Sequence, residues 1–486
     1  MKRSILHIIT CSLVLLSSCS EEFLDRNYPG DLGYDKLYIT ESDFWAALAG
    51  CYQSITDIST NTIQIGELPS DNAYVSRFQT SGSHVDLDRL GFTAQTGIFD
   101  SYWSGNFTTI QRVNLLIDKL QASNVNQTAQ QKIVAEARFL RAYAYFNLVR
   151  VFGGVPLYPE YLDLSKIYDI PRASEEEVFA LIIADLQEAA NIDSYRSTDE
   201  NQKAGGRATT VAAKTLLGKV HLWKHDFPAA ENVLSEVLTS GKTLVDLDVL
   251  YHPDQPFNNE IIFSINYDRA SGFGSPFVNT TVPYNSPQGL VYPNVQGQAG
   301  SGIYMIEPYV AEKFAPADKR GELLQEVTYD ILGSVENNIF SLKYIDPNTT
   351  FNSLSGANTI ILRYADVLLM YAEALNENGK TEQAYPYVNQ VRQRANVGDL
   401  PEGLSKPEMF EALANERQKE FLLEGDRWFD LRFRGIDYLK REMNAFMPHA
   451  HQSQNQELQV RDAHILFPLP EEQLLIKPVL KQNAGY

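Results

Sequence analysis

Apolar residues recur at helical spacing over most of the chain. Over residues 43–51 they follow the i, i+3, i+4, i+7 pattern of one helix face, and Ser42 or Asp43 can cap this helix. The same spacing predicts further helices over residues 100–120, 131–152, 174–186 and 407–423. The helix over residues 131–152 has a strong apolar stripe and ends at Gly153-Gly154, since Pro156 prevents it from resuming. Ser174 and Glu177 have the spacing of a capping box, which supports the helix that follows them.

Residues 206–238 read as a helical hairpin of the tetratricopeptide type. Leu217-Gly218, Phe227, Ala230 and Leu234 occupy template positions at the expected spacing. Gly218 and Ala230 are small, as two closely crossing helices require. An ordinary antiparallel helix pair remains an alternative, because His221 takes the place of an aromatic residue.

A second hairpin of the same kind is predicted over residues 363–394. Its crossing alanine, Ala384, lies 384 − 230 = 154 residues after Ala230, which is no multiple of the ~34-residue repeat. Residues 244–359 therefore read as an insertion, and there Gly, Pro, Asn and Ser are dense and helical period is lost. Runs at 261–265 and 339–344 predict isolated short strands. The fold class expected is mainly α, a tetratricopeptide-like scaffold with an irregular, loop-rich half.

The N-terminus has the features of an export signal. Lys2 and Arg3 precede a mostly apolar run over residues 5–16, which is too short for a membrane span of ~20 residues. Leu16-Ser17-Ser18-Cys19 resembles the lipobox of bacterial lipoproteins, which implies lipidation of Cys19. Cleavage by an ordinary signal peptidase, with Cys19 incidental, remains the alternative. Ser20-Glu21-Glu22 resembles the acidic signal that directs Bacteroidetes lipoproteins to the outer face of the outer membrane.

Cysteine count and charge narrow the possible partners. Of Cys11, Cys19 and Cys51, the first leaves with the signal and the second is lipidated, so we expect no disulfide. The chain has 41 basic and 61 acidic residues, a formal charge of −20. Loss of Lys2 and Arg3 makes this 39 − 61 = −22. Such a surface repels phosphate backbones, so nucleic acid is not expected as a partner, and heavily sulfated or uronate-rich glycans should bind poorly.

Several long motifs together resemble the SusD/RagB family of outer-membrane lipoproteins. They run in family order from the lipobox to the last residue and include Glu136-Ala137-Arg138-Phe139-Leu140-Arg141-Ala142-Tyr143, Val151-Phe152-Gly153-Gly154-Val155-Pro156-Leu157, Pro171-Arg172-Ala173-Ser174, the run from Leu362 to Ala374, Val391-Arg392-Gln393-Arg394-Ala395, Glu416-Arg417-Gln418-Lys419-Glu420-Phe421, Gly425-Asp426-Arg427-Trp428-Phe429-Asp430-Leu431, Leu466-Phe467-Pro468-Leu469-Pro470 and Asn483-Ala484-Gly485-Tyr486. These motifs build a scaffold, so they indicate the family and not the ligand.

The resemblance implies a domain layout. It comprises a lipoprotein signal peptide over 1–18, a lipidated tether over 19–40 and one body over 41–486, with helical repeats at about 41–243 and 360–435, the loop-rich insertion at about 244–359 and a C-terminal segment at 436–486. The family places its ligand-binding half where the insertion falls.

The resemblance also implies a function. Members are lipid-anchored, surface-exposed binding proteins without enzymatic activity or cofactor. They capture oligosaccharides or polysaccharides and deliver them to a SusC-like TonB-dependent transporter in the outer membrane. Some members take peptides, so the same type of lipoprotein binding peptides is one alternative. A tetratricopeptide interaction protein of the cell envelope is another, and a glycoside hydrolase would need a carboxylate pair that the pattern does not select.

A neutral glycan is bound by flat aromatic faces and by planar polar side chains. The region before and into the helix at 100–120 offers such groups. The resemblance implies first-half ligand contacts in about this region, with an Asp, an Arg and a Trp among those of the family's starch-binding member. The candidates are Asp71, Asn72, Arg77, Tyr102 and Trp103. The competing interpretations are a core position for Trp103 and a solvated Asp71–Arg77 pair.

A second candidate set lies between residues 271 and 309. Five aromatic residues occur there among Gly, Pro and Asn: Phe273, Phe277, Tyr284, Tyr292 and Tyr304. Either they pin the loop to the scaffold or some face outward as a stacking platform. Tyr284 and Tyr292 are the preferred candidates, because neighbouring prolines hold them at low entropy cost; Tyr304 is also retained.

The remaining polar groups suggest structure rather than chemistry. Arg138, Arg141, Arg150, Glu416, Arg417 and Arg427 are expected to form inter-helix ion pairs. His449, His451 and His464 lack a tight constellation of metal ligands, so solvated loop positions are expected and no metal site is predicted.

Overall fold

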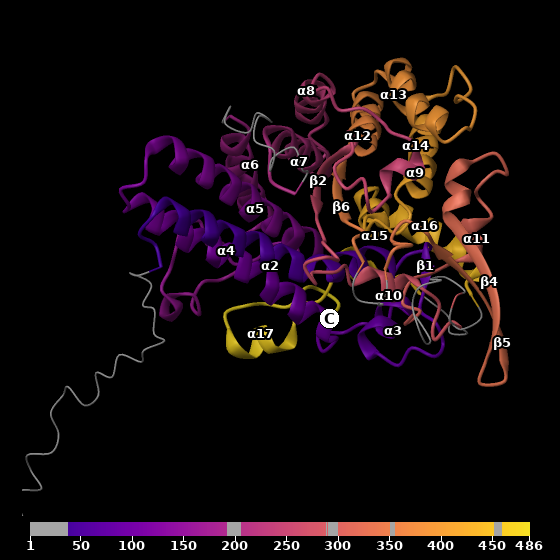
Figure 1. Ribbon diagram of the computed structural model, residues 1–486, viewed down its shortest axis with the longest axis horizontal. Coiled ribbons are helices and arrows are strands. Elements are labelled where there is room, and N and C mark those ends of the chain that lie inside the picture. The colour runs from indigo at the N-terminus through magenta and orange to yellow at the C-terminus, as the bar shows by residue number, and fades with distance from the viewer. Residues whose placement is uncertain (1–36, 192–205, 288, 290–299, 350–354, 452–458) are drawn as a thin grey trace, which may run out of the picture.

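The computed structural model describes residues 37–191, 206–287, 289, 300–349, 355–451 and 459–486. Helices dominate, and the strands are few and short, which confirms the predicted fold class. In Figure 1 the long helices form the left and upper parts of the molecule, and most of the loops and strands gather at the lower right.

Four long helices make the first layer. They are α2 (Glu41–Glu67), α4 (Gly97–Gln121), α5 (Gln127–Phe152) and α6 (Glu175–Ala190), with short α3 (Gly82–Asp88) and η3 (Leu164–Lys166) between them. Helix α5 packs against both α4 and α6. Ser174 caps α6 in the predicted capping box with Glu177. Helix α2 has a capping box of its own, in which Thr40 is the cap and Asp43 is the acidic partner. The predicted caps, Ser42 and Asp43, therefore lie within the helix.

Two helical hairpins follow the predicted tetratricopeptide pattern. They are formed by α7 (Thr210–Trp223) with α8 (Phe227–Leu238), and by α12 (Tyr364–Glu377) with α13 (Thr381–Arg394). A Cβ added at Gly218 would lie 2.4 Å from Cδ2 of Leu234, so the close crossing requires glycine. Helix α8 packs on α12, which places the two hairpins together although the insertion separates them in sequence.

The segment between the hairpins carries short elements. Its helices are α9 (Leu247–Leu250), α10 (Phe277–Thr281), α11 (Pro308–Ala311) and η5 (Lys319–Leu323). Its strands, with β1 (Ala73–Tyr74) from the first part of the chain, are β2 (Ile261–Ile265), β3 (Met305–Ile306), β4 (Leu324–Ile331), β5 (Ser334–Ser341) and β6 (Thr359–Arg363).

The predicted isolated strands are paired. Strand β2 pairs antiparallel with β6, β1 with β3, and β4 with β5 in a regular hairpin. The prediction of isolated strands was wrong because a strand's partner is set by long-range packing, which short apolar runs do not reveal.

The C-terminal part returns to the first helices. It contains α14 (Lys406–Glu420), α15 (Arg427–Phe433), α16 (Ile436–Phe446), η6 (Met447–His449), η8 (Asp462–Ile465) and α17 (Glu471–Ile476). The amide of Asn483 donates to the carbonyl oxygens of Phe152 (3.0 Å) and Phe467 (2.7 Å), which closes the tail on the end of α5.

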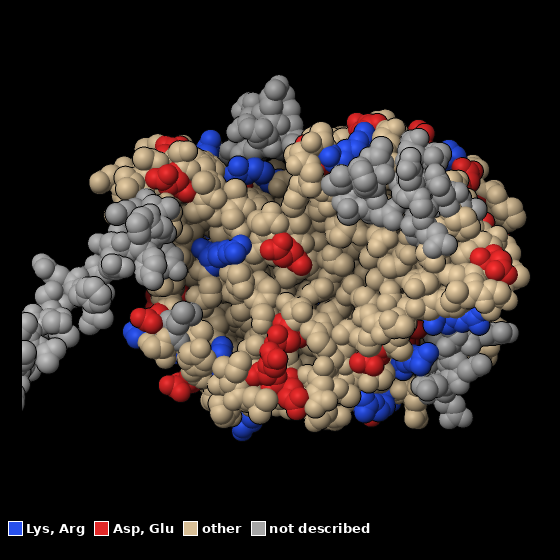
Figure 2. Space-filling model, turned by 60° about the horizontal axis from the view of Figure 1, so that its bottom comes forward, with Lys and Arg blue, Asp and Glu red and all other residues tan. Residues whose placement is uncertain are grey.

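The lower face of Figure 1 comes forward in Figure 2. On this face the area to the right of the centre is largely uncharged, and a group of acidic side chains lies below the centre. One large core cluster includes buried residues of the four long helices, of both helical hairpins and of the strands β2 and β6.

Candidate functional site

The chain after α2 begins with a buried polar cluster. Arg427 donates to Asp71 in a bidentate ion pair, with Nε–Oδ1 at 2.7 Å and Nη2–Oδ2 at 2.9 Å. Gln418 donates to Asp71 Oδ2 (2.8 Å) and to Asn72 Oδ1 (3.1 Å), while the Asn72 amide donates to Glu67 (2.9 Å). Burial alone would raise the pKa of Asp71, but attraction to Arg427 lowers it, so the carboxylate stays charged.

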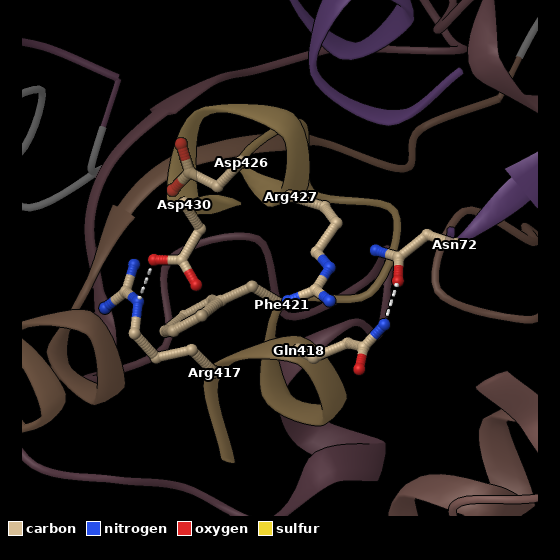
Figure 3. A pocket seen from close by; sticks show the side chains of 7 residues that line it. All are labelled: Asn72, Arg417, Gln418, Phe421, Asp426, Arg427 and Asp430. Atoms are coloured by element: carbon tan, nitrogen blue, oxygen red, sulfur yellow. Dashed lines mark hydrogen bonds and ion pairs between the residues drawn. The ribbon is translucent and has the colours of Figure 1, made fainter. Parts of the chain in front are cut away.

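Asp71 and Asn72 therefore cannot contact a ligand in this structure, and the two candidates are corrected. Their exposed fractions are 1% and 0%. Figure 3 shows Asn72, Gln418 and Arg427 pointing toward one another around a cavity of about 10 Å³, which is room for about one water molecule. A ligand pocket measures roughly 300–1,000 Å³, so this cavity belongs to the scaffold. The predicted Asp71–Arg77 pair is also wrong, because Asp71 is neutralised inside the protein.

Close backbone contact holds this cluster in place. A Cβ added at Gly66 would lie 1.9 Å from the carbonyl oxygen of Gly425, so α2 touches the turn before α15 directly. The amide of Gly425 donates to Glu67 Oε1 (2.7 Å). Burial raises the pKa of Glu67 to about 7, although hydrogen bonds from Asn72 and Gly425 oppose this.

The signature-motif charges form the predicted inter-helix ion pairs. Arg141 on α5 pairs with Asp185 on α6 (2.7 Å), and Arg417 on α14 pairs with Asp430 on α15 (2.7 Å, Figure 3). Arg417 also pairs with Asp366 on α12 (2.9 Å). Burial would raise the pKa of Asp366, but Lys219 and Arg417 lower it to about 2. These groups hold elements together and leave no charge free for a ligand.

Three of the aromatic candidates are core residues. Tyr102, Trp103 and Tyr304 have exposed fractions of 0%, 2% and 0%. Trp103 lies on the inner face of α4, where its ring is 5.2 Å from that of Phe152 and 4.9 Å from that of Phe107, centroid to centroid. The side chains offer no surface to a sugar, so the core interpretation of Trp103 is correct and the ligand interpretation of all three is corrected.

Two candidates lie at the surface and meet there. Arg77 has a side-chain exposure of 49%, and Tyr284 is partly exposed. Phe78, which the sequence analysis did not select, lies between them: its ring is stacked on Tyr284 at 5.7 Å and 21°, and the Arg77 guanidinium carbon lies 4.9 Å from its centroid. We call Arg77, Phe78 and Tyr284 the Phe78–Tyr284 platform. Its position next to Arg77 in a loop is the sequence feature that could have identified Phe78 as a candidate.

Neighbouring loops fix the platform. Tyr329 on β4 donates its hydroxyl to the Tyr284 carbonyl oxygen (2.6 Å), and Arg77 forms an ion pair with Glu336 on β5. The Ser76 amide donates to the Gly302 carbonyl (2.8 Å). A Cβ added at Gly302 would lie 2.8 Å from Ser76 Cβ and 3.0 Å from Tyr284 Cβ, so glycine permits the two loops to approach. The two loops that carry the rings are thus tied to the segment at Gly302 and to both strands of the β4–β5 hairpin.

The other second-set residues take different places. Phe277 is buried and stacks on Tyr344 at 5.3 Å, while Phe273 is 41% exposed and stacks on Tyr267. Tyr292 lies outside the described residues.

The three histidines are less exposed than predicted. His464 is 1% exposed and bonded to Arg461, and His451 stacks on buried Tyr74 at 4.0 Å and 7°. Only His449 is exposed, and it stacks on Tyr309 at 5.4 Å. In the described part of the chain, no group of three His, Cys, Asp or Glu side chains is placed to hold a metal ion. Of the helices described, none is both long and apolar enough to cross a membrane.

The fold is a tetratricopeptide-like helical scaffold with a loop-rich half that carries the Phe78–Tyr284 platform. Two family models match the chain: the SusD family over residues 328–486, and a family described as starch-binding and associating with the outer membrane over residues 22–222. The chain belongs to the SusD family, as the motifs predicted.

Relatives match over nearly the whole chain. SusD-like protein P38 of Formosa agariphila is 28% identical to this chain, and the alignment covers 99% of each of the two chains. A structure described as a laminarin-binding SusD-like protein has a TM-score of 0.77 at 26% identity, covering 92% of this chain and 100% of that one. Surface glycan-binding protein A from Bacteroides fluxus has a TM-score of 0.75 at 25% identity, with the same coverage.

Proposed function

We propose that this protein is a lipid-anchored glycan-binding protein on the outer face of the outer membrane. It captures oligosaccharides and delivers them to a SusC-like TonB-dependent transporter. The observation that carries the proposal is the Phe78–Tyr284 platform, two stacked and half-buried rings that pack on a small core cluster beside the exposed guanidinium group of Arg77.

The chemistry of the platform suits a sugar. An aromatic face attracts the C–H surface of a pyranose ring, and burying that apolar area releases water. The guanidinium of Arg77 is planar and has several N–H donors for hydroxyl groups, and its ion pair with Glu336 keeps it in place. Because the platform is fixed before binding, little conformational entropy is lost when the ligand arrives.

The surroundings favour a neutral ligand. The platform's cation, Arg77, is neutralised by its ion pair with Glu336. With a net charge of −20 on the whole chain, an anionic polymer would be repelled at long range. The laminarin-binding relative supports this choice, since it is 26% identical and aligns with 92% of the chain.

Anchoring rests on the N-terminal sequence. The lipobox-like Leu16-Ser17-Ser18-Cys19 precedes the described body, which begins at Leu37. Eighteen residues from Cys19 to Leu37 span at most about 65 Å when extended, at roughly 3.3–3.6 Å per residue. A lipid on Cys19 would hold the body within that distance of the membrane.

A glycan array tests the proposal. The chain from Ser20 onward should bind at least one class of neutral oligosaccharide, at micromolar to millimolar strength, about −4 to −8 kcal/mol. The bound sugar should be recovered intact. Binding of peptides but no glycan would move the assignment to a peptide-binding lipoprotein, and release of shortened sugars would make the protein an enzyme.

A further inference from the structure

The hairpin of β4 and β5 projects from the loop half of the molecule. Its two strands pair in register from Leu324↔Ser341 to Ile331↔Ser334. In Figure 1 the hairpin runs along the right side, and its end reaches beyond the helices nearby. The turn at this end consists of two residues, Leu332 and Gly333.

The turn carries an unusual residue. Leu332 has φ +52° and Gly333 has φ +79°, so both turn residues are left-handed. Two-residue hairpin turns of this kind favour Asn-Gly, because a leucine side chain crowds its own backbone at positive φ. Leu332 thus costs stability at a position where several other residues would cost less.

The same leucine gains nothing from burial. Leu332 is 87% exposed, and Val335, three residues further on, is 73% exposed. The strand residues before and beneath them, such as Ile331 and Phe340, are buried at 6% and 0%. Two apolar side chains at a projecting tip, one of them on a strained backbone, are explained when another molecule covers them.

Charge indicates what kind of molecule this is. Residues 324–341 include Glu326, Asp330 and Glu336 and contain no Lys or Arg. Asp330 is exposed and pairs across the hairpin with Val335, so acid flanks the apolar tip. Acidic groups are repelled by an anionic membrane surface, and tips that enter lipid carry basic residues instead. A protein pocket with an apolar floor and a basic or hydrogen-bond-donating rim fits better.

Close to its turn, the hairpin is joined to the Phe78–Tyr284 platform through the cross-strand pair Tyr329 and Glu336. Tyr329 is bonded to Tyr284, and Glu336 to Arg77. A protein that holds the tip is therefore held in fixed register with the proposed ligand site.

We propose that the tip of the β4–β5 hairpin is a docking point for the transporter, with Leu332 and Val335 entering an apolar pocket of that protein. The inference rests on the proposed function, which supplies the partner, and adds the surface that contacts it.

Site-specific photocrosslinking in the cells that make this protein tests the inference. A photoreactive phenylalanine analogue replaces Leu332 in the full-length lipidated chain, and the product is identified by mass spectrometry. The matched control carries the same analogue at Leu475, which is 74% exposed on α17. We expect a crosslink to a TonB-dependent transporter from position 332 and none from position 475. A crosslink to lipid, equal crosslinking from both positions, or no crosslink from 332 would overturn the docking assignment.

Leu332→Asn gives a second readout. It creates the favoured Asn-Gly turn, so its melting temperature should equal or exceed that of the wild type, while transporter recovered with the detergent-extracted protein should fall several-fold. Unchanged recovery would overturn the inference and leave the proposed function intact. If the wild-type protein itself recovers no transporter, the delivery role fails as well, whereas glycan binding is measured independently on the array.

Discussion

Burial decides the role of each aromatic residue in this protein. Trp103 and Tyr284 were both candidates for stacking on sugar, yet one lies in the core at 2% exposure and the other is partly exposed and stacks on Phe78. Their local sequences did not separate the two roles, because a tryptophan at a helix start can face either inward or outward.

Replacement of Trp103 by alanine should therefore lower the stability of the fold rather than act on ligand binding directly. Removing a fully buried large ring costs about 3–5 kcal/mol through lost burial and the cavity left behind. Denaturant unfolding should show this loss for Trp103→Ala and a much smaller one for Tyr284→Ala. Equal losses for the two variants would show that Tyr284 belongs to the core and would remove it from the proposed site.

Glu307 is a buried carboxyl whose ionisation opposes folding. Its side chain is fully buried, and burial, with repulsion from Asp88 and Asp71, raises its pKa to about 9 from an ordinary 4.5. One carboxyl oxygen accepts from the backbone N–H of His451 at 3.0 Å. The folded state therefore binds this proton more tightly than the unfolded state does.

The sign of the pH dependence follows. The contribution of Glu307 to stability is fully present below about pH 4.5 and is lost as pH rises through about 9. Denaturant midpoints from pH 5 to 9 should thus fall more steeply for the wild type than for Glu307→Gln. The exposed control Glu312→Gln should follow the wild type. Parallel curves for wild type and Glu307→Gln would contradict the raised pKa.

At the scale of elements, helices were predicted well because their apolar period and caps are local. The helix at 100–120 is observed at Gly97–Gln121, and the one at 131–152 at Gln127–Phe152. The tetratricopeptide template placed Gly218 at the crossing for the correct reason. The prediction that the strands are isolated failed because the partner of β2 lies about a hundred residues away, in β6.

Two glycines test the crossing directly. Gly218→Ala places a methyl group against Leu234, and overpacking of this kind costs about 1–3 kcal/mol. Gly50→Ala is the matched control: Gly50 lies in α2 with no atom near its would-be Cβ, so alanine should stabilise the protein by roughly 0.5–1 kcal/mol. Thermal unfolding of both variants measures the difference. A shift of the same sign in both would contradict the close crossing.

At the scale of the whole molecule, the site depends on contacts that sequence spacing cannot give. Arg427 and Asp71 are 356 residues apart and form a bidentate pair, so Asp71 is removed from the surface by a residue near the other end of the chain. The platform likewise joins Phe78 to Tyr284 and both to the hairpin. The sequence thus indicated the family, the fold class and two of the three platform residues. The other candidates that the structure describes are buried, and the contacts that bury them could not be predicted from sequence spacing.

Titration calorimetry on the Phe78–Tyr284 platform tests the central claim most directly. With an oligosaccharide that binds on the array, Tyr284→Ala should weaken binding about tenfold, which corresponds to about 1.4 kcal/mol. Tyr161→Ala, at a ring that is 39% exposed away from the platform, should bind as the wild type does. Equal affinity of Tyr284→Ala and wild type, with the fold intact, would contradict the account.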